Sequence, residues 1–214
     1  MTFALLIDLD GVLRHRDSAL VAEAERAAGL PQGGVMAVAF EPDLLGAVVT
    51  GRMTQEEWEA EIVRVLARRY PDADGVAAVG TALGDVGYVD REVLALVDEV
   101  RSQVPVCLVS NASSRLHADL ELLGLRDHVD FVVSSADLGV AKPDRRIFAE
   151  AARLAGVELG HCLMVDDSAT ITAAAEAVGM SAHTFTGPAA LARWLRSELR
   201  SRPECAPDRI RRPR

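Results

Sequence analysis

The chain has 214 residues, of which 50% are hydrophobic and 26% are charged, as in a globular protein with a sizeable core. Its net charge of -9 argues against broad nucleic-acid binding, which needs a basic surface. No apolar run approaches membrane-spanning length, and the three cysteines are far apart with no CxxC pair. These features predict a protein of the reducing cytoplasm that binds neither nucleic acid nor membranes.

The first predicted strand is Phe3–Ile7, a short apolar run that stops at Asp8 and is followed by a glycine-containing loop. The interval from residue 14 to residue 84 has helical patterns instead. Its predicted helices are Ser18–Ala28, a segment near Pro42–Val49, Thr54–Arg69 and a short one after Asp74. Thr54 and Glu57 have the spacing of a capping box at the start of the third helix. We therefore expect residues 14–84 to form an all-helical insertion.

After residue 84, apolar runs alternate with helical patterns. The predicted strands are Val104–Val109, Phe131–Val133, Cys162–Val165 and, more weakly, Ala182–Phe185. The predicted helices are Arg91–Val100, Ser114–Leu123, Arg145–Leu154, Thr170–Val178 and Ala189–Leu199. This alternation implies a parallel sheet covered on both faces, so residues 1–13 and 85–199 are expected to form a three-layer, Rossmann-like α/β core.

The last fifteen positions, residues 200–214, differ in composition from the rest of the chain. They hold six arginines against two acidic residues, with three prolines and no apolar period. Such a composition predicts a disordered basic tail, which either is a solvated terminus or serves a binding partner.

Polar side chains stand at the carboxyl ends of the predicted strands. They are Asp8 and Asp10, Ser110 and Asn111, Lys142 in the loop after the third strand, and Asp166 and Asp167. Loops that leave these ends of a parallel sheet meet in one crevice, so the four carboxylates should face one another. Gathered carboxylates need a cation, and an all-oxygen ligand set favours Mg²⁺. Lys142 and Asn111 are also the only lysine and the only asparagine of the chain.

Four stretches of this sequence, in this order, resemble the motifs of the haloacid dehalogenase superfamily. The stretches are Asp8-Leu9-Asp10-Gly11-Val12-Leu13, Ser110-Asn111, Lys142-Pro143 and Val165-Asp166-Asp167-Ser168. The resemblance covers about residues 2–199, and the helical insertion matches the superfamily's small helical cap. A lone DxDG is unspecific, because calcium loops and turns also contain it. All four stretches in order, each after a predicted strand, are a specific match.

The resemblance implies a Mg²⁺-dependent phosphatase that acts on a small phosphorylated metabolite. Asp8 would attack phosphorus and form an aspartyl-phosphate. Asp10 would protonate the leaving oxygen and then take a proton from the attacking water, while its backbone carbonyl binds the metal. Asp167, together with Asp8, would bind Mg²⁺ directly, and Asp166 would hold a metal-bound water.

The resemblance also assigns the phosphate-binding groups. Ser110 and Lys142 would clamp the phosphoryl group, and backbone N–H groups near Gly11 and Asn111 would complete the cradle. One position departs from the pattern: many members carry Asn or Asp four residues beyond the second aspartate, and this chain has Ile171 there. This departure leaves open a catalytically weak protein that only binds phosphorylated metabolites.

Other activities of the superfamily differ in residues that this sequence shows. Dehalogenases generally lack the second aspartate of the first motif, so Asp10 argues against dehalogenation. Phosphonate-cleaving members need a cap lysine for a Schiff base, and Lys142 lies outside the insertion. A phosphomutase stays open because it uses the same nucleophile and general acid/base. The polar candidates for substrate selection are His15, Arg16 and Arg52, whereas the substrate and the oligomeric state are not specified by the sequence.

Overall fold

The computed structural model describes residues 3–201. The predicted basic tail, residues 200–214, begins inside a helix that ends at Arg200, and its residues 202–214 lie outside the described residues. The centre of the structure is a five-stranded parallel sheet with the strand order β5-β4-β1-β6-β7. The strands are β1 (Ala4–Ile7), β4 (Val106–Ser110), β5 (Phe131–Ser134), β6 (Cys162–Asp166) and β7 (Ser181–Thr184). All five predicted strands are therefore present, and the predicted three-layer α/β fold is confirmed.

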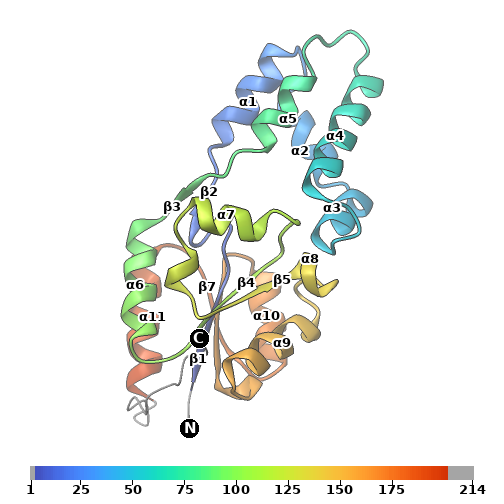
Figure 1. The fold of residues 1–214 in the computed structure, drawn as a ribbon. Coiled ribbons are helices and arrows are strands. Elements are labelled where there is room, and N and C mark those ends of the chain that lie inside the picture. The colour runs from blue at the N-terminus through green and yellow to red at the C-terminus, as the bar shows by residue number, and fades with distance from the viewer. Residues whose placement is uncertain (1–2, 202–214) are drawn as a thin grey trace.

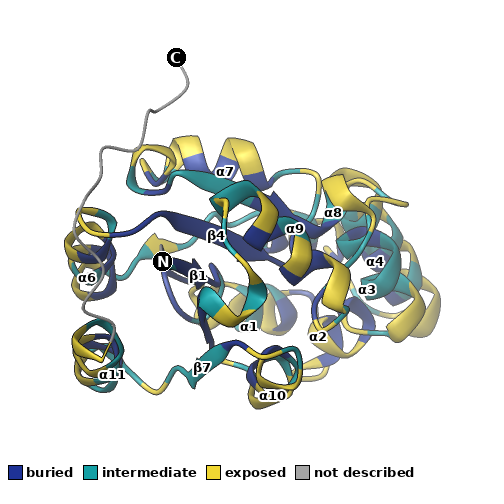
Figure 2. Cartoon of the chain, turned by 90° about the horizontal axis from the view of Figure 1, so that it is seen from below, coloured by how far each residue is buried: buried dark blue, intermediate teal, exposed yellow. Residues whose placement is uncertain are grey.

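Helices cover both faces of the sheet, as Figures 1 and 2 show. On one face lie α6 (Arg91–Arg101), α7 (Leu116–Leu122) and α11 (Pro188–Arg200), and on the other α9 (Arg145–Ala155) and α10 (Ala169–Ala177). Alternate residues of β1 enter the two apolar layers: Leu5 and Ile7 pack towards α6, and Ala4 and Leu6 towards α9. The central strands are therefore buried on both sides, as their unbroken apolar sequences require.

Five further helices form a separate helical block between the first two sheet strands in sequence. They are α1 (Ser18–Ala27), α2 (Gly34–Ala39), α3 (Pro42–Val49), α4 (Gln55–Arg69) and α5 (Ala77–Leu83). The block packs around its own apolar cluster, with Ile62, Leu66 and Val79 fully buried. The predicted capping box of α4 is confirmed: Thr54 Oγ1 accepts from the Glu57 backbone, and Glu57 accepts from the Thr54 backbone.

A short antiparallel ribbon joins the helical block to the sheet (Figure 1). It consists of β2 (Arg14–His15) and β3 (Tyr88–Val89), where the chain leaves the sheet region and returns to it. Three contacts also place the block against the loops at the carboxyl ends of the strands. The Gln55 backbone donates to Ser114 Oγ at 3.1 Å, Glu59 lies 3.7 Å from Arg115, and Gly51 packs against the Ala136 carbonyl.

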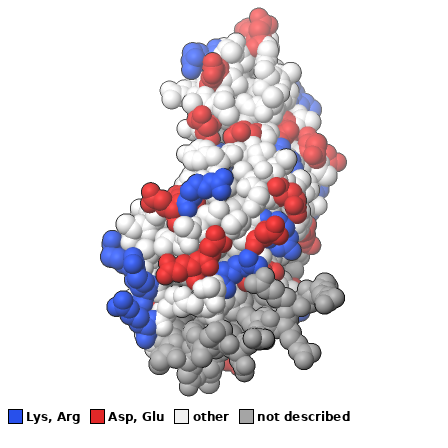
Figure 3. All heavy atoms as spheres, turned by 60° about the vertical axis from the view of Figure 1, so that its left-hand side comes forward, with Lys and Arg blue, Asp and Glu red and all other residues white. Residues whose placement is uncertain are grey.

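Two properties of the described residues bear on partners. None of the helices within residues 3–201 is long and apolar enough to cross a membrane. On the face that Figure 3 shows, basic side chains are interspersed with acidic ones. The described residues of that face therefore do not form a continuous basic field of the kind with which proteins bind the nucleic-acid backbone.

Candidate active site

The strand order places the predicted site residues at one edge of the sheet. β1 lies between β4 and β6, with Ile7 aligned to Leu108 on one side and to Val165 on the other. Asp8, which follows β1, therefore lies between the ends of the two neighbouring strands, which carry Ser110 and Asp166.

Lys142 joins two of these carboxylates. Its Nζ lies 2.9 Å from Asp8 Oδ1 and 2.7 Å from Asp166 Oδ2, and the lysine is only 4% exposed. Burial lowers the pKa of Lys142, but the charges of Asp8 and Asp166 outweigh burial and raise it. Burial raises the pKa of Asp8 to about 7, and Asp166 adds to this effect while Lys142 opposes it. The ammonium of Lys142 is therefore held charged beside a carboxyl that is easily protonated.

The side chain of Asn111 holds the loop that carries Lys142. Its Nδ2 donates to the Lys142 carbonyl at 2.9 Å, and its Oδ1 accepts from the Lys142 backbone N–H at 2.7 Å. The amide is thus used to fix the loop that carries the lysine, and only the Asn111 backbone is left as a phosphate donor. Ser110 is different: its Oγ is buried and has no hydrogen-bond partner among residues 3–201. A buried hydroxyl of this kind is suited to a ligand oxygen.

The donor set fits a hard divalent cation. Asp8, Asp166 and Asp167 each offer one oxygen, and these oxygens lie within 4.8 Å of one another. Burial raises the pKa of Asp167, and the charge of Asp166 adds to this effect while Lys142 opposes it, as expected where three carboxylates share one ammonium. Asp166 already accepts from Lys142 and, through Oδ1, from the Ser168 backbone. Asp8 and Asp167 are therefore better placed than Asp166 to bind Mg²⁺ directly.

Ile171 supplies no ligand to this group. Its half-buried side chain packs with the apolar cluster between the sheet and helices α9 and α10. The departure from the family pattern at this position is thus explained by core packing.

Gly11 lies against the acidic group in a conformation that favours glycine. Its φ is +79°, and a Cβ there would stand 2.2 Å from Asp167 Oδ2. We expect Gly11→Ala to weaken Mg²⁺ binding by roughly tenfold or more, because the methyl group displaces a ligand oxygen. Calorimetric titration with Mg²⁺ measures this change. Gly139→Ala is the matched control, since Gly139 has a φ of +72° and nothing within 4 Å of its Cβ position. Equal affinities of the two variants would contradict the expectation.

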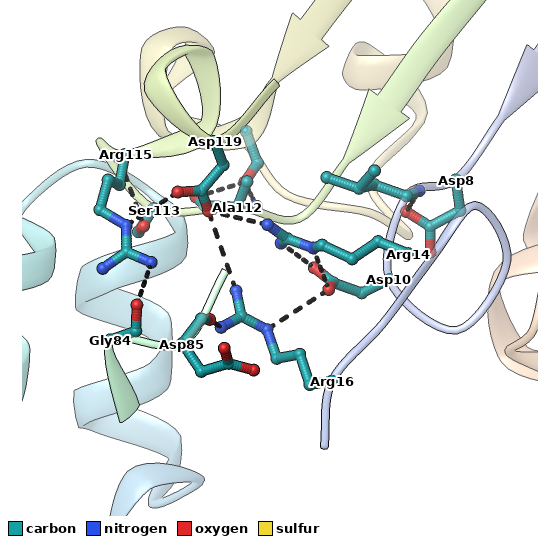
Figure 4. A network of polar contacts seen from close by, with 12 residues as sticks. Asp8, Asp10, Arg14, Arg16, Gly84, Asp85, Ala112, Ser113, Arg115 and Asp119 are labelled. Atoms are coloured by element: carbon teal, nitrogen blue, oxygen red, sulfur yellow. Dashed lines mark hydrogen bonds and ion pairs between the residues drawn. The ribbon is translucent and has the colours of Figure 1, made fainter. Parts of the chain in front are cut away.

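Asp10 does not join the other three carboxylates, contrary to the prediction that all four face one another. Its Oδ1 and Oδ2 accept from Arg14 Nε and Nη2, each at 2.8 Å, and Arg16 Nε lies 3.6 Å from Oδ1 (Figure 4). Burial raises the pKa of Asp10, but hydrogen bonds and charge from Arg14 outweigh it and lower the pKa overall. The arrangement therefore holds Asp10 as a carboxylate, the form that accepts a proton.

Sequence reasoning missed the partners of Asp10. Arg14 is 2% exposed, and its Nη1 donates to Asp119 on α7 at 2.7 Å. Asp119 is also buried and accepts from Arg115 Nε at 2.9 Å. Nothing in the spacing of these residues marks them, since Asp119 is 105 positions from Arg14. The one available signal for Arg14 was its position directly after the apolar residues Val12 and Leu13, where a charged residue is unexpected.

The three candidates for substrate selection lie in different surroundings. His15 Nε2 is 3.3 Å from Asp90 Oδ2 in the linking ribbon, which indicates a hinge contact. Arg16 lies beside Asp10 and donates to the Asp85 carbonyl. Arg52 is exposed in the turn before α4, with its Nε donating to Thr50 Oγ1 at 3.1 Å. Of the three, only Arg16 contacts a residue of the predicted catalytic set.

Comparison with known proteins shows the family of the chain. A family model described as haloacid dehalogenase-like hydrolase matches residues 4–179. The haloacid dehalogenase-like hydrolase domain-containing protein 3 of Bos taurus is 44% identical over 84 residues, which are 39% of this chain and 34% of that protein. The match thus spans about a third of the length of that relative. A phosphatase of Mycobacterium tuberculosis is 29% identical over 187 residues, covering 84% of this chain and 85% of that protein.

A solved structure shows the same fold. It is a HAD family enzyme of Bacteroides thetaiotaomicron in complex with magnesium and inorganic phosphate, with a TM-score of 0.66 and 21% identity. The superposition covers 86% of this chain and 94% of that one. With the family model matching most of the sequence and the strand-end residues in place, the chain belongs to the haloacid dehalogenase-like hydrolase family.

Proposed function

We propose that this chain is a Mg²⁺-dependent phosphatase that hydrolyses a small phosphate monoester through an aspartyl-phosphate on Asp8. The observation that carries the proposal is the asymmetry of the Asp8 carboxylate. Oδ1 accepts from the Leu9 backbone at 2.7 Å and lies 2.9 Å from Lys142 Nζ. Oδ2 has no hydrogen-bond partner within residues 3–201. One oxygen is thus held in place, and the other is available to attack phosphorus.

The chain's own residues account for the two displacements. In the first, Asp8 Oδ2 bonds to phosphorus, the bond from phosphorus to the ester oxygen breaks, and that oxygen leaves with the proton that Asp10 took up in the previous turnover. Lys142 and Ser110 contact the phosphoryl oxygens. In the second, water attacks the same phosphorus, its proton passes to Asp10, and the bond to Asp8 breaks. Mg²⁺ held by Asp8, Asp167 and the Asp10 carbonyl would neutralise charge on the transferring group.

A small substrate is proposed because the helical block stands over the site. Its contacts at Ser114 and Ala136 bring it against the loops at the carboxyl ends of the strands, where Asp8 also lies, and as a cap it would restrict the space there. The net charge of -9 further disfavours large polyanions at long range. Arg16 and Arg52 are the proposed cap-side contacts of the substrate. A screen of small phosphorylated metabolites, run with wild type and Arg52→Ala, tests the proposed contact of Arg52 with the substrate. A substrate for which KM is higher in Arg52→Ala than in the wild type supports that contact.

Removal of the metal tests the reaction class. We expect the wild type to release inorganic phosphate from 4-nitrophenyl phosphate with Mg²⁺, and to lose that activity when the metal is chelated. Acid quenching during turnover should trap phosphate on the peptide that contains Asp8, as detected by mass spectrometry. No metal-dependent release would contradict the proposal. Binding of inorganic phosphate without turnover would then favour a sensor, and transfer to a sugar phosphate without net release would favour a mutase.

A further inference from the structure

The starting observation is a buried ion pair that connects α7 to the first loop of the site. Asp119 Oδ2 accepts from Arg14 Nη1 at 2.7 Å, and the two side chains are only 5% and 3% exposed. Asp119 Oδ1 accepts from Arg115 Nε at 2.9 Å, so both of its oxygens are engaged. The position of Arg14 is thereby fixed by a helix that contributes nothing directly to the acidic group.

Because the guanidinium of Arg14 is planar, fixing its position also fixes the position of Asp10. Its N–H groups form a rigid fork: Nη1 points to Asp119, while Nε and Nη2 bind the two oxygens of Asp10 (Figure 4). If Nη1 is held, the plane of the Asp10 carboxylate is held as well. A carboxylate has about four acceptor positions, so Asp10 keeps acceptor capacity beyond its two bonds to Arg14.

The three side chains differ in solvent exposure: Asp119 and Arg14 are buried, and Asp10 is accessible. The Asp10 side chain is 43% exposed, whereas its partner Arg14 is 3% exposed. Desolvation of two charges offsets much of the stability that a buried pair contributes, so stability alone is a weak reason for the pair. An accessible carboxylate oriented by a buried pair is what proton transfer requires, because transfer depends on the position of the accepting oxygen.

We propose that Asp119, acting through Arg14, is a positioning residue that holds Asp10 as the base for hydrolysis of the aspartyl-phosphate. This inference rests on the proposed phosphatase function. In the step concerned, a water oxygen bonds to phosphorus and its proton moves to an oxygen of Asp10. The bond between phosphorus and Asp8 breaks, and its electron pair returns to the Asp8 carboxylate, releasing inorganic phosphate.

The test separates the second displacement from the first. With 4-nitrophenyl phosphate the leaving group departs without a proton, so kcat/KM reports phosphorylation of Asp8 and kcat reports hydrolysis of the intermediate. For Asp119→Asn we expect kcat to fall by about 10–100-fold, the order of a general-base contribution, with kcat/KM within about threefold of wild type. KM falls in parallel, and acid-quenched protein carries more phosphate during turnover.

Two further variants make the result decisive. Arg14→Lys keeps the buried positive charge but removes the fork, and it should reproduce the effect of Asp119→Asn. Asp130→Asn is the matched control: Asp130 pairs with Arg101 at 3.1 Å and binds the Val106 backbone at the opposite end of β4. It should leave both the kcat to kcat/KM ratio and the phosphoenzyme level unchanged.

The measurements distinguish a failure of the positioning role from a failure of the proposed phosphatase function. If kcat and kcat/KM fall by the same factor in Asp119→Asn and Arg14→Lys, with no rise in phosphoenzyme, the positioning role is overturned. Turnover by the wild type then still supports the phosphatase function. Absence of turnover in the wild type overturns the phosphatase itself, and the positioning role with it.

Discussion

Replacing Asp8 with asparagine is expected to lower Mg²⁺-dependent turnover by at least ~10³-fold, because the amide cannot form the aspartyl-phosphate. The comparison is steady-state hydrolysis of 4-nitrophenyl phosphate by wild type and variant under saturating Mg²⁺. Asp144→Asn is a suitable control, since Asp144 caps α9 by accepting from the Arg146 backbone and does not contact the acidic group. Turnover that is unchanged in the Asp8 variant would show that another group is the nucleophile.

The same variant should be more stable than wild type in the absence of metal. Burial raises the pKa of Asp8 from 3.8 to about 7, so the folded state binds the proton more tightly than the unfolded state. The stabilising effect of this proton is complete below pH 4 and is lost as the pH rises to 7. At pH 8 the ionised, buried carboxylate costs up to ~4 kcal/mol, which asparagine removes.

Urea unfolding of metal-free protein across pH 4–8 measures this difference. We expect the two unfolding free energies to converge at low pH and to separate as Asp8 ionises. A variant that is less stable than wild type at pH 8 would show that the pairing of Asp8 with Lys142 outweighs the burial of its charge.

Replacing Lys142 with methionine has the second large expected effect. The change leaves Asp8 and Asp166 buried without their shared ammonium, which is 2.9 Å and 2.7 Å away in the wild type. We expect the free energy of unfolding at pH 8 to fall by about 3–5 kcal/mol, as when one partner of a buried ion pair is removed. Activity should fall by roughly 10²-fold or more, because a fixed charge at the transferring group is lost.

Two comparisons and a control variant isolate the cause of that effect. At pH 5 the loss of stability should be smaller, since Asp8 takes up a proton and the repulsion with Asp166 disappears. The double variant Asp8→Asn/Lys142→Met should be more stable at pH 8 than Lys142→Met alone, which gives the coupling by a double-mutant cycle. Arg153→Met, which removes an exposed pair with Glu150, should change stability little. Equal losses at both pH values would point to lost packing of the lysine stem instead.

The sheet and its order of elements were predictable from the sequence because buried parallel strands are unbroken apolar runs. Phe3–Ile7 and Cys162–Val165 were placed within a residue of β1 and β6. Helix α2 was not predicted, because its N-terminus depends on a tertiary contact: Glu25 accepts from the backbone of Gly33 and Val35. The two-residue strands of the linking ribbon are too short to leave a periodic pattern.

For the site, the rule that loops meet at the strand ends was sufficient to gather Asp8, Ser110, Lys142, Asp166 and Asp167. It could not give the direction of individual side chains. Asp10 turns to Arg14 because Arg14 is itself fixed by a helix far away in the sequence. The direction of the Asn111 amide also depends on the folded chain. It binds the backbone N–H and carbonyl of Lys142, which need hydrogen-bond partners in the folded protein.

The central place of β1 has a consequence for hydrogen exchange. Its amides are bonded between β4 and β6, and local opening that reaches them must first separate the middle of the sheet. The backbone leading to Asp8 should therefore exchange only through global unfolding. The helical block has its own smaller apolar cluster and is joined through a two-residue ribbon, so its amides are expected to exchange through a separate, lower-energy opening. The proposed nucleophile, Asp8, is thus expected to follow the most slowly exchanging strand of the described residues, and the helical block is expected to exchange faster.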